Sequence, residues 1–211
     1  MKNIIVFGAS GRTGKYVVQY ALQAGHKVTA FVHQQSSAFT HPNLSVITGD
    51  VNNKDKVVHS IKGHDVIIST LGAKQIEGDA VNLMSNAMKI FVEAMNTFGI
   101  KRVLAVGGLG VLQLNETTQL LDKPDYPAQY KSIGEGHNKV YKVLRETQLD
   151  WTFACCPDII DGERTGKYNL KKDYPAEGKY QILTGDLADF LVKELSENNF
   201  LKTRVGIANA K

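Results

Sequence analysis

The segment Gly8-Ala9-Ser10-Gly11-Arg12-Thr13-Gly14 decides the fold of this chain. It follows the apolar run of residues 3–7 directly and opens the helical pattern of residues 15–24. Its first glycine permits a tight turn, its second lets the backbone approach a pyrophosphate, and its third lets the helix pack closely on the strand. The start of the helix offers unpaired N–H groups and a partial positive charge to phosphates. The segment therefore predicts a dinucleotide-binding turn.

The rest of the chain alternates short apolar runs with longer helical patterns, which is typical of a parallel sheet covered by helices. The expected strands are residues 3–7, 27–32, 44–48, 65–70, 102–106 and 151–155, and the expected helices are residues 15–24, 54–61, 81–98, 131–147 and 186–196. Residues 111–128 are expected to form a loop, 158–180 a polar connection and 205–208 an edge strand. We predict one α/β domain over residues 1–211, a doubly wound parallel sheet of the Rossmann type.

Composition excludes several classes of protein. The 211 residues are 43% hydrophobic and 22% charged, which suits one well-buried core. The chain has neither an apolar run of about 20 residues nor a signal-peptide pattern, so we expect a cytoplasmic protein without a membrane partner. A net charge of +4 without blocks of like charge gives little support to nucleic-acid binding. Cys155 and Cys156 are adjacent and are expected to be buried on a strand without a relaxed disulfide, and no metal is expected.

The turn also carries a resemblance. Its G-x-x-G-x-x-G spacing resembles the G-A-T-G-x-T-G turn of atypical short-chain dehydrogenases of the NmrA-like group, and is most similar to the biliverdin reductase B (flavin reductase) family. The resemblance covers nearly the whole chain. Further matching segments are Thr48-Gly49-Asp50-Val51, Ser69-Thr70-Leu71-Gly72, Lys142-Val143-Leu144-Arg145-Glu146-Thr147, Thr165-Gly166-Lys167-Tyr168 and Gly185-Asp186-Leu187-Ala188-Asp189-Phe190.

The resemblance implies how a coenzyme lies on these segments. In the family, the position of Asp50-Val51 contacts the adenine, Leu71-Gly72 lies beside the ribose and nicotinamide, and Gly107-Gly108 faces the nicotinamide. Asp50 has an alternative or additional role as a helix N-cap. The predicted coenzyme-binding residues are Gly8, Ser10, Gly11, Arg12, Thr13, Gly14, His33, Asp50, Val51, Leu71, Gly72 and Gly107.

The end of the second strand bears on the choice of coenzyme. Sites that prefer NAD place an acid there to bind the ribose 2′-hydroxyl, but the segment Val32-His33-Gln34-Gln35-Ser36-Ser37 has none. In the family that the chain resembles, the position of His33 is commonly an arginine that grips the 2′-phosphate. His33, Ser36, Ser37 and Arg12 are candidate phosphate donors, and the alternative for His33 is a surface histidine. We expect NADP(H) to be preferred over NAD(H).

The catalytic end lacks the usual proton donor of carbonyl reduction. Short-chain dehydrogenases use a Tyr-x-x-x-Lys pair, whereas Tyr141 has Arg145 at that spacing, and the pKa of arginine is too high for a proton relay. The resemblance aligns a family serine with Gly108 and a family histidine with Asp158. His137 matches another family histidine, with an exposed helix residue as its alternative. Gly108, His137, Tyr141 and Asp158 are therefore catalytic candidates without assigned roles.

These features favour a particular reaction. A carbonyl reductase without a placed acid forfeits about 10²–10⁴-fold in rate, whereas a flavin or quinone delocalises the charge and takes its proton from water. Gly107, Gly108 and Gly110 are expected to leave open space over the nicotinamide, in an acceptor site formed by loops around 107–128 and 157–180. We predict an NAD(P)H-dependent oxidoreductase, a monomer or weak homodimer, that reduces a planar conjugated acceptor: flavin first, then tetrapyrrole or quinone. A non-catalytic NADP(H) sensor and an epimerase-like or dehydratase-like enzyme are the alternatives.

Overall fold

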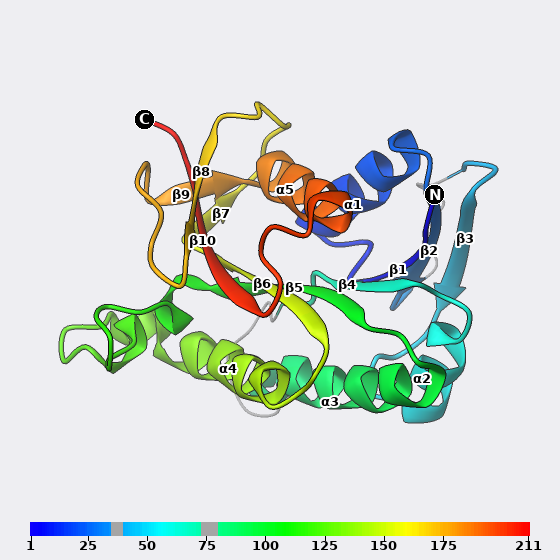
Figure 1. The fold of residues 1–211 in the computed structure, drawn as a ribbon, viewed down its shortest axis with the longest axis horizontal. Helices are drawn as coiled ribbons and strands as arrows, with labels where there is room; N and C mark the ends of the chain where they lie inside the picture. Colours follow the sequence, from blue (N-terminus) through cyan, green and yellow to red (C-terminus); the bar gives the residue numbers. More distant parts are fainter. Residues whose placement is uncertain (35–39, 73–79) are drawn as a thin grey trace.

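The computed structural model describes residues 1–34, 40–72 and 80–211 and is built around one eight-stranded sheet (Figure 1). The strand order is β3-β2-β1-β4-β5-β6-β10-β8. All neighbouring strands are parallel except β10 and β8, which are antiparallel. The strands are β1 (Asn3–Phe7), β2 (Lys27–Val32), β3 (Leu44–Thr48), β4 (Val66–Ser69), β5 (Arg102–Gly108), β6 (Asp150–Cys156), β8 (Tyr168–Lys172) and β10 (Thr203–Asn209). A separate parallel pair joins β7 (Asp158–Ile160) to β9 (Gln181–Leu183).

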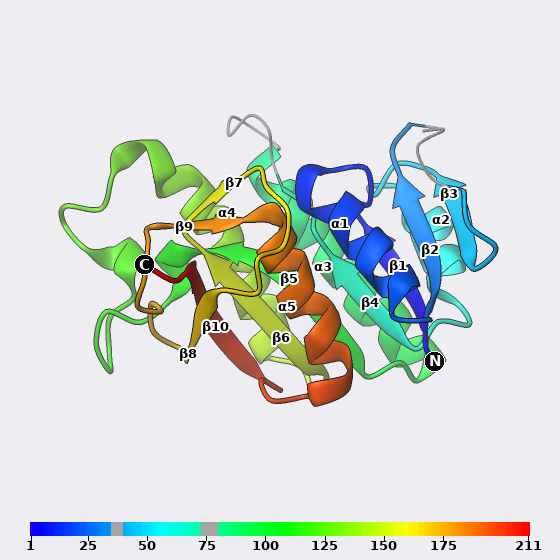
Figure 2. The same ribbon diagram turned by 90° about the horizontal axis from the view of Figure 1, so that it is seen from above.

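Helices cover both faces of the sheet, as the doubly wound prediction requires. Helices α1 (Arg12–Gln23) and α5 (Thr184–Glu197) pack together on one face, which is the face turned toward the viewer in Figure 2. Helices α2 (Lys54–Ile61), α3 (Ala80–Phe98) and α4 (Ala128–Arg145) cover the other face (Figure 1). Each face therefore has its own apolar core, and the central strands are buried on both sides. Within the described ranges, no helix is long and apolar enough to cross a membrane.

The order of the strands reverses beside β1, which lies between β2 and β4. In doubly wound sheets, ligands bind at the carboxyl ends of the strands at such a switch point. The glycine turn leads out of β1 at this place, and α1 begins at Arg12, three residues earlier than the sequence predicted. The free N–H groups of the helix therefore lie within the turn itself.

Two sequence expectations about the C-terminal part are wrong. The strand expected at residues 205–208 is longer and is not at the edge, because β10 lies between β6 and β8. The edge position belongs to β8, which forms within the polar segment expected to be a connection. Its polar residues gave no apolar pattern because four of the five β8 residues are exposed.

Buried polar residues hold the 158–180 segment in place. Asp186 is fully buried at the start of α5 and accepts hydrogen bonds from the N–H groups of Thr165 (2.6 Å) and Gly166 (2.9 Å). Asn209 on β10 donates to the same carboxylate, and the Tyr168 hydroxyl donates to Asp189 at 3.0 Å. Two of the segments that carry the family resemblance thus meet here. Their contacts support a loop beside the cleft described below.

Candidate functional site

The glycine turn has the geometry that its spacing predicts. Gly8 has a positive φ of 79°, and its carbonyl accepts a hydrogen bond from the N–H of Gly11 at 2.9 Å. A Cβ on Gly14 would overlap that same carbonyl, so only glycine lets α1 start this close to β1. Gly11 itself has φ −72° and ψ 171°, which any residue can adopt, and a Cβ there would meet only the Gly8 carbonyl oxygen, at 3.1 Å. The φ and ψ angles therefore do not require glycine at position 11, although a Cβ there would need a small shift of the Gly8 carbonyl.

Thr70 fastens the turn to the neighbouring strand β4. Its N–H donates to the carbonyl of Phe7 at 2.9 Å, and its hydroxyl lies 3.1 Å from the carbonyls of Phe7 and Gly8. Sequence reasoning did not place Thr70 in the site. The sequence feature that could have indicated Thr70 is its position directly after a buried strand that is parallel to β1.

A cleft of about 450 Å³ opens from the turn along the carboxyl ends of β1, β4, β5 and β6. This volume is within the range of about 300–1,000 Å³ that is typical of ligand sites. The predicted coenzyme residues that line it are Gly11, Arg12, Thr13, Leu71, Gly72 and Gly107, and the lining catalytic candidates are Gly108, His137 and Asp158. The cleft therefore joins the two segments that the sequence assigned to coenzyme and acceptor.

The residues predicted near the adenine end lie at the ends of β2 and β3. His33 and Asp50 are both exposed there, and the N–H of Gly49 donates to the carbonyl of Val32 at 2.8 Å, which holds these two strand ends together. Asp50 is not the N-cap of α2: that residue is Asn53, and Asp50 accepts from the N–H of Asn52 at 2.8 Å. Ser36 and Ser37 lie outside the described residues, and Ser10 is exposed on the turn.

Arg12 reaches from the turn across to β7. Its Nη1 donates to the carbonyl of Ile159 at 3.2 Å and lies 3.4 Å from a carboxylate oxygen of Asp161. The side chain of Arg12 is 61% exposed, so this pair holds the guanidinium only weakly. A weakly held cation beside free helix N–H groups is suited to a pyrophosphate.

The cleft reaches Gly107 and Gly108 at the end of β5, as the predicted open space requires, but Gly110 does not line it. A Cβ on Gly107 would overlap the ring of Phe153, one on Gly108 would lie 2.6 Å from Nδ1 of His137, and one on Gly110 would lie 2.6 Å from the hydroxyl oxygen of Tyr126. Each glycine accommodates a neighbouring side chain. Of these side chains, Tyr126 and His137 line the cleft, whereas Phe153 belongs to the buried core.

His137 is the most unusual polar group of the cleft. Its Nδ1 is shielded from solvent and has no hydrogen-bond partner among the described residues. Burial lowers the pKa of His137 to about 4, so its imidazole is neutral at pH 7. A neutral imidazole can donate one hydrogen bond and accept another. A buried polar atom without a partner costs free energy, and a ligand in the cleft is one means of supplying that partner.

Tyr141 lies away from the cleft. Its ring packs edge-on against Trp151 at 6.0 Å, and the guanidinium of Arg204 lies 4.5 Å from the ring centroid. The expectation that the sequence holds no Tyr-x-x-x-Lys pair is wrong, because Tyr168 and Lys172 have this spacing. This pair is on strand β8, where the Tyr168 hydroxyl donates to Asp189, and neither residue lines the cleft.

Three tyrosines that sequence reasoning missed stand around the mouth of the cleft. Tyr126 and Tyr130 come from the α4 side, and Tyr180 comes from the segment before β9. Tyr130 is 38% exposed and Tyr180 is 67% exposed, which is high for aromatic side chains. Burial, followed by the proximity of Tyr180 and Tyr130, raises the pKa of Tyr126. Nothing local in the sequence marks these residues, because they converge from distant segments.

Residues 8–198 match the model of a family described as NAD(P)H-binding. The chain belongs to this NAD(P)H-binding family. The match begins at the first glycine of the turn and ends one residue after α5, so it includes both ends of the cleft.

Relatives and solved structures of similar size agree with this assignment. YwnB of Bacillus subtilis, an uncharacterized protein, is 29% identical over 198 residues, which cover 90% of each chain. A Streptococcus pneumoniae structure described as a proposed NADH-flavin reductase is 32% identical with a TM-score of 0.86, covering 99% of this chain and 100% of that one. A Bacteroides thetaiotaomicron structure described as a proposed epimerase is 26% identical with a TM-score of 0.86, covering 100% and 98%. The family therefore includes reductase-like and epimerase-like proteins on one fold.

Proposed function

We propose that the chain is an NAD(P)H-dependent reductase that transfers a hydride to a planar conjugated acceptor, with flavin as the first candidate. The observation that carries the proposal is the set of three tyrosines that line the cleft, Tyr126, Tyr130 and Tyr180, in the same cleft as the strand end at Gly107. Flat conjugated molecules stack on aromatic side chains, whereas a small aliphatic carbonyl gains little from such walls.

The residues of the chain have separate tasks in this reaction. The turn at Gly11 and Arg12 holds the pyrophosphate, and the strand end at Gly107 and the segment Leu71-Gly72 position the nicotinamide, which supplies the hydride when it is bound. Neutral His137 supplies a hydrogen bond to whatever lies above Gly108. The exposed mouth at Tyr180 admits water, which provides the proton that a reduced flavin or quinone requires.

We further propose NADP(H) as the preferred coenzyme. His33 and Gln34 are exposed at the end of β2, where an NAD-preferring site would place a carboxylate. Arg12 is the basic residue of the glycine turn, and its side chain is only weakly engaged by Asp161. The resemblance to the biliverdin reductase B family points to the same coenzyme.

The proposal agrees with the proposed NADH-flavin reductase from Streptococcus pneumoniae, whose length this chain matches completely. The proposed epimerase from Bacteroides thetaiotaomicron supports a second candidate. The position of Tyr141 disfavours that candidate, because its hydroxyl lies outside the cleft where an epimerase would need a proton-relaying tyrosine.

Stopped-flow oxidation of bound NADPH tests the proposal. We expect saturable oxidation with FMN, riboflavin or a 1,4-quinone, and none with simple ketones. Oxidation by ketones but not by flavins or quinones would overturn the proposal in favour of a carbonyl reductase. If NADPH binds but no acceptor oxidises it, the chain is a nucleotide sensor. Turnover of nucleotide sugars with no net change in NADP(H) would identify an epimerase.

A further inference from the structure

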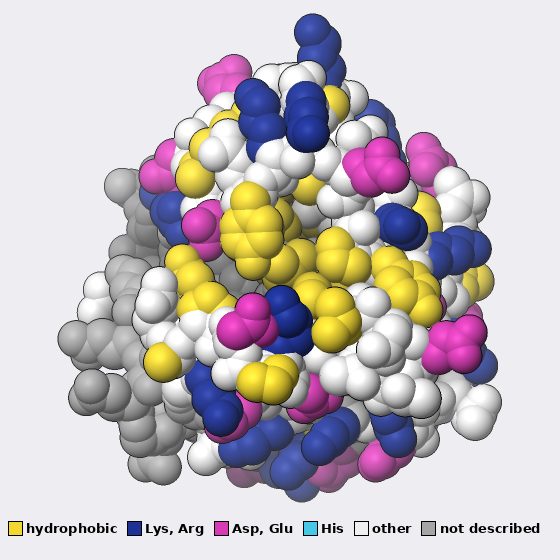
Figure 3. Space-filling model, turned by 90° about the vertical axis from the view of Figure 1, so that its left-hand side faces the viewer, with side chains coloured by type: hydrophobic (Ala, Val, Ile, Leu, Met, Phe, Trp, Pro, Cys, Tyr) yellow, Lys and Arg dark blue, Asp and Glu magenta, His cyan; other side chains and the backbone are white. Residues whose placement is uncertain are grey.

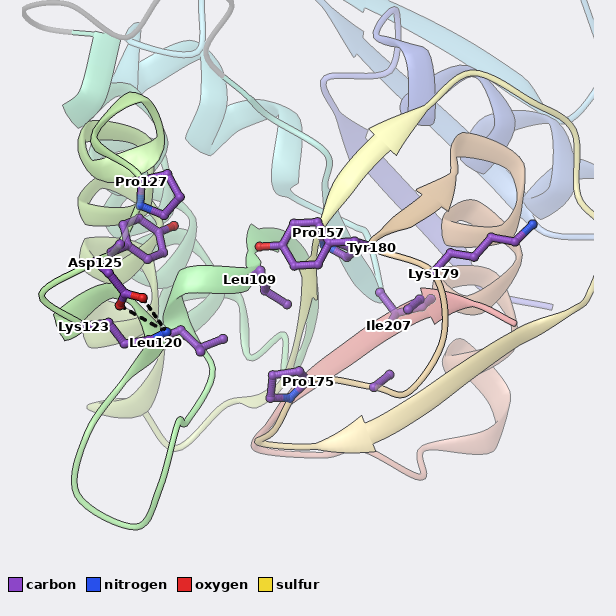
Figure 4. A pocket seen from close by; sticks show the side chains of 13 residues that line it. Leu109, Leu120, Lys123, Asp125, Pro127, Pro157, Pro175, Lys179, Tyr180 and Ile207 are labelled. Carbon is purple, nitrogen blue, oxygen red and sulfur yellow. Dashed lines mark hydrogen bonds and ion pairs between the residues drawn. The ribbon is translucent and has the colours of Figure 1, made fainter. Parts of the chain in front are cut away.

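A second cavity of about 270 Å³ lies beside the cleft (Figure 4). One wall is the segment from Leu120 to Pro127, and the other is formed by Pro175, Tyr180 and Ile207. We call it the side pocket. It shares four wall residues with the cleft, namely Leu109, Tyr126, Pro157 and Tyr180. The two spaces are therefore neighbours along these four residues.

The lining of the side pocket is apolar. Its inner surface consists of Leu109, Leu120, Pro175, Ala176, Ile207 and Ala208. Of the charged residues at its rim, Lys123 pairs with Asp125 at 3.1 Å, and Figure 4 shows Lys179 pointing away from the cavity. Figure 3 shows hydrophobic side chains gathered in the middle of this end of the molecule, with a basic and an acidic side chain among them and further charged ones around them. The surface therefore suits an uncharged apolar group.

The size of the side pocket argues against an independent ligand. Its volume of about 270 Å³ is below the range of about 300–1,000 Å³ that ligand sites have. A cavity of about 150 Å³ holds one benzene molecule, so the side pocket holds an apolar group of roughly ten carbon atoms. A group of that size that enters past Tyr126 and Tyr180 is best understood as part of a molecule whose remainder lies in the cleft.

We propose that the acceptor of this chain is amphipathic, with a conjugated ring in the cleft and an apolar substituent of up to about ten carbons in the side pocket. This inference rests on the proposed reductase function and names the class of its acceptor. The substituent passes between Tyr126 and Tyr180 and packs on Leu120, Ala176 and Ile207. The reaction remains a two-electron reduction: the ring gains the hydride of the bound nicotinamide and a proton from water, and the coenzyme is oxidised.

A matched set of 1,4-quinones tests the inference. The ring stays constant while its alkyl chain is methyl, pentyl, decyl or hexadecyl, each below its critical micelle concentration. Burial of a methylene contributes about 0.8 kcal/mol at full transfer, so kcat/KM with NADPH should rise by up to about fourfold per methylene. The rise should stop near ten carbons, where the side pocket is full.

Two variants locate the chain in the side pocket. Ala176→Trp and Leu120→Trp each fill it from a different wall, so each should abolish the gain from pentyl and decyl while leaving kcat/KM for the methyl compound within about twofold. Ala24→Trp is the control, because Ala24 is exposed at the end of α1 and lines neither cavity. It should keep the full dependence on chain length.

The outcomes separate the two proposals. If the wild type reduces the methyl compound and the longer ones equally well, the amphipathic acceptor is overturned and the reductase stands. The amphipathic acceptor is likewise overturned if the gain survives in whichever of the two filled variants folds. If no quinone or flavin oxidises NADPH, the proposed function fails and this inference fails with it.

Discussion

The two ends of the cleft differ in what forms them: one is formed mostly by backbone groups and the other mostly by side chains. The coenzyme end is mostly backbone: the carbonyls of Phe7 and Gly8 accept from Thr70 and Gly11, and glycine is needed where α1 meets β1. The acceptor end is mostly side chain, with rings of Tyr126, His137 and Tyr180 brought together from distant segments. Backbone geometry restricts which residue types fit at a position, whereas a cleft wall made of side chains can be built from many different residue types. The first end therefore leaves a signature in the sequence and the second does not.

The strongest way to break this contrast is to add a side chain to the backbone end. Gly11→Val places a branched side chain where a pyrophosphate would approach, while φ −72° and ψ 171° remain acceptable for valine. Loss of two or more charge-assisted hydrogen bonds, each about 1.5–3 kcal/mol, predicts at least a 100-fold weaker affinity for NADPH by calorimetry. Circular dichroism should remain near native. Tight binding retained by this variant would remove the turn from the coenzyme site.

The same contrast explains how much the sequence predicted. The first eight helices and strands, from β1 to β5, follow the expected order. They were predictable because the spacing of apolar residues indicates helix or strand, and glycines mark the turns between them. Strand β8 was not predicted because it is exposed and polar. Strand β10 was predicted at the edge of the sheet because its pairing with β8 was not foreseen. The proximity of Tyr126 and Tyr180 was not predicted, because no local sequence pattern marks two residues from distant loops as neighbours.

Gly107, Gly108 and Gly110 show the limit of reading glycine as empty space. All three were expected to open the site, and Gly107 and Gly108 do line the cleft, but the position that a Cβ would take on each glycine is crowded by Phe153, His137 or Tyr126. A glycine records that something approaches the backbone, and the sequence alone does not say whether it is a ligand or another side chain. A Cβ at Gly11 would meet only one backbone oxygen, at 3.1 Å, whereas a Cβ at Gly107, Gly108 or Gly110 would overlap a side chain.

The next largest effect should come from the contact of Gly108 with His137. A Cβ at Gly108 would lie 2.6 Å from Nδ1, so Gly108→Ala must displace the imidazole. A misplacement of about 1 Å can cost up to about 100-fold, and we expect flavin or quinone reduction to slow by about 10- to 100-fold. His137→Ala alone should cost less than about tenfold, below the range for a general acid. The double variant should recover to the level of His137→Ala. Additive losses in this cycle would show that the two positions act independently.

The pKa of His137 gives the acceptor end a pH-dependent stability. Its folded pKa of about 4 lies below the unfolded value of about 6.5, so the unfolded chain binds more protons between these values. The contribution of His137 is therefore full above pH 6.5 and is lost as the pH falls toward 4, by about 1–3 kcal/mol. Urea unfolding of the wild type and His137→Leu at pH 7.5 and 5 measures the difference. His26 and His64, whose pKa values burial also lowers, remain in both proteins and cancel. Identical pH dependence in the two proteins would refute the assignment.

A smaller effect should separate the two coenzymes. Gln34→Asp places a carboxylate at the exposed end of β2, where it repels a 2′-phosphate and accepts a hydrogen bond from a 2′-hydroxyl. We expect the ratio of NADPH to NADH affinity to fall by about tenfold, equivalent to about 1.4 kcal/mol. Gln34→Asn is the matched control, with similar size and no charge, and should leave the ratio unchanged. Equal losses for both coenzymes in Gln34→Asp would place the adenosine ribose away from this strand end.

The smallest effect should come from Tyr141, the residue whose spacing to Arg145 looks most like a catalytic pair. The ring of Tyr141 packs against Trp151, and the guanidinium of Arg204 lies over its face. A phenylalanine at this position would retain both contacts. Because the hydroxyl lies outside the cleft, Tyr141→Phe should change kcat/KM by less than about threefold, against about 10²–10⁴-fold for a true general acid.

Tyr180→Ala is the comparison within the cleft and should raise KM for the planar acceptor more than Tyr141→Phe does, since it removes a stacking surface. A loss of 100-fold or more in Tyr141→Phe, with NADPH binding intact, would reverse the comparison. The acceptor end would then rely on a proton donor carried by α4, and carbonyl reduction would replace reduction of a planar acceptor as the proposed chemistry.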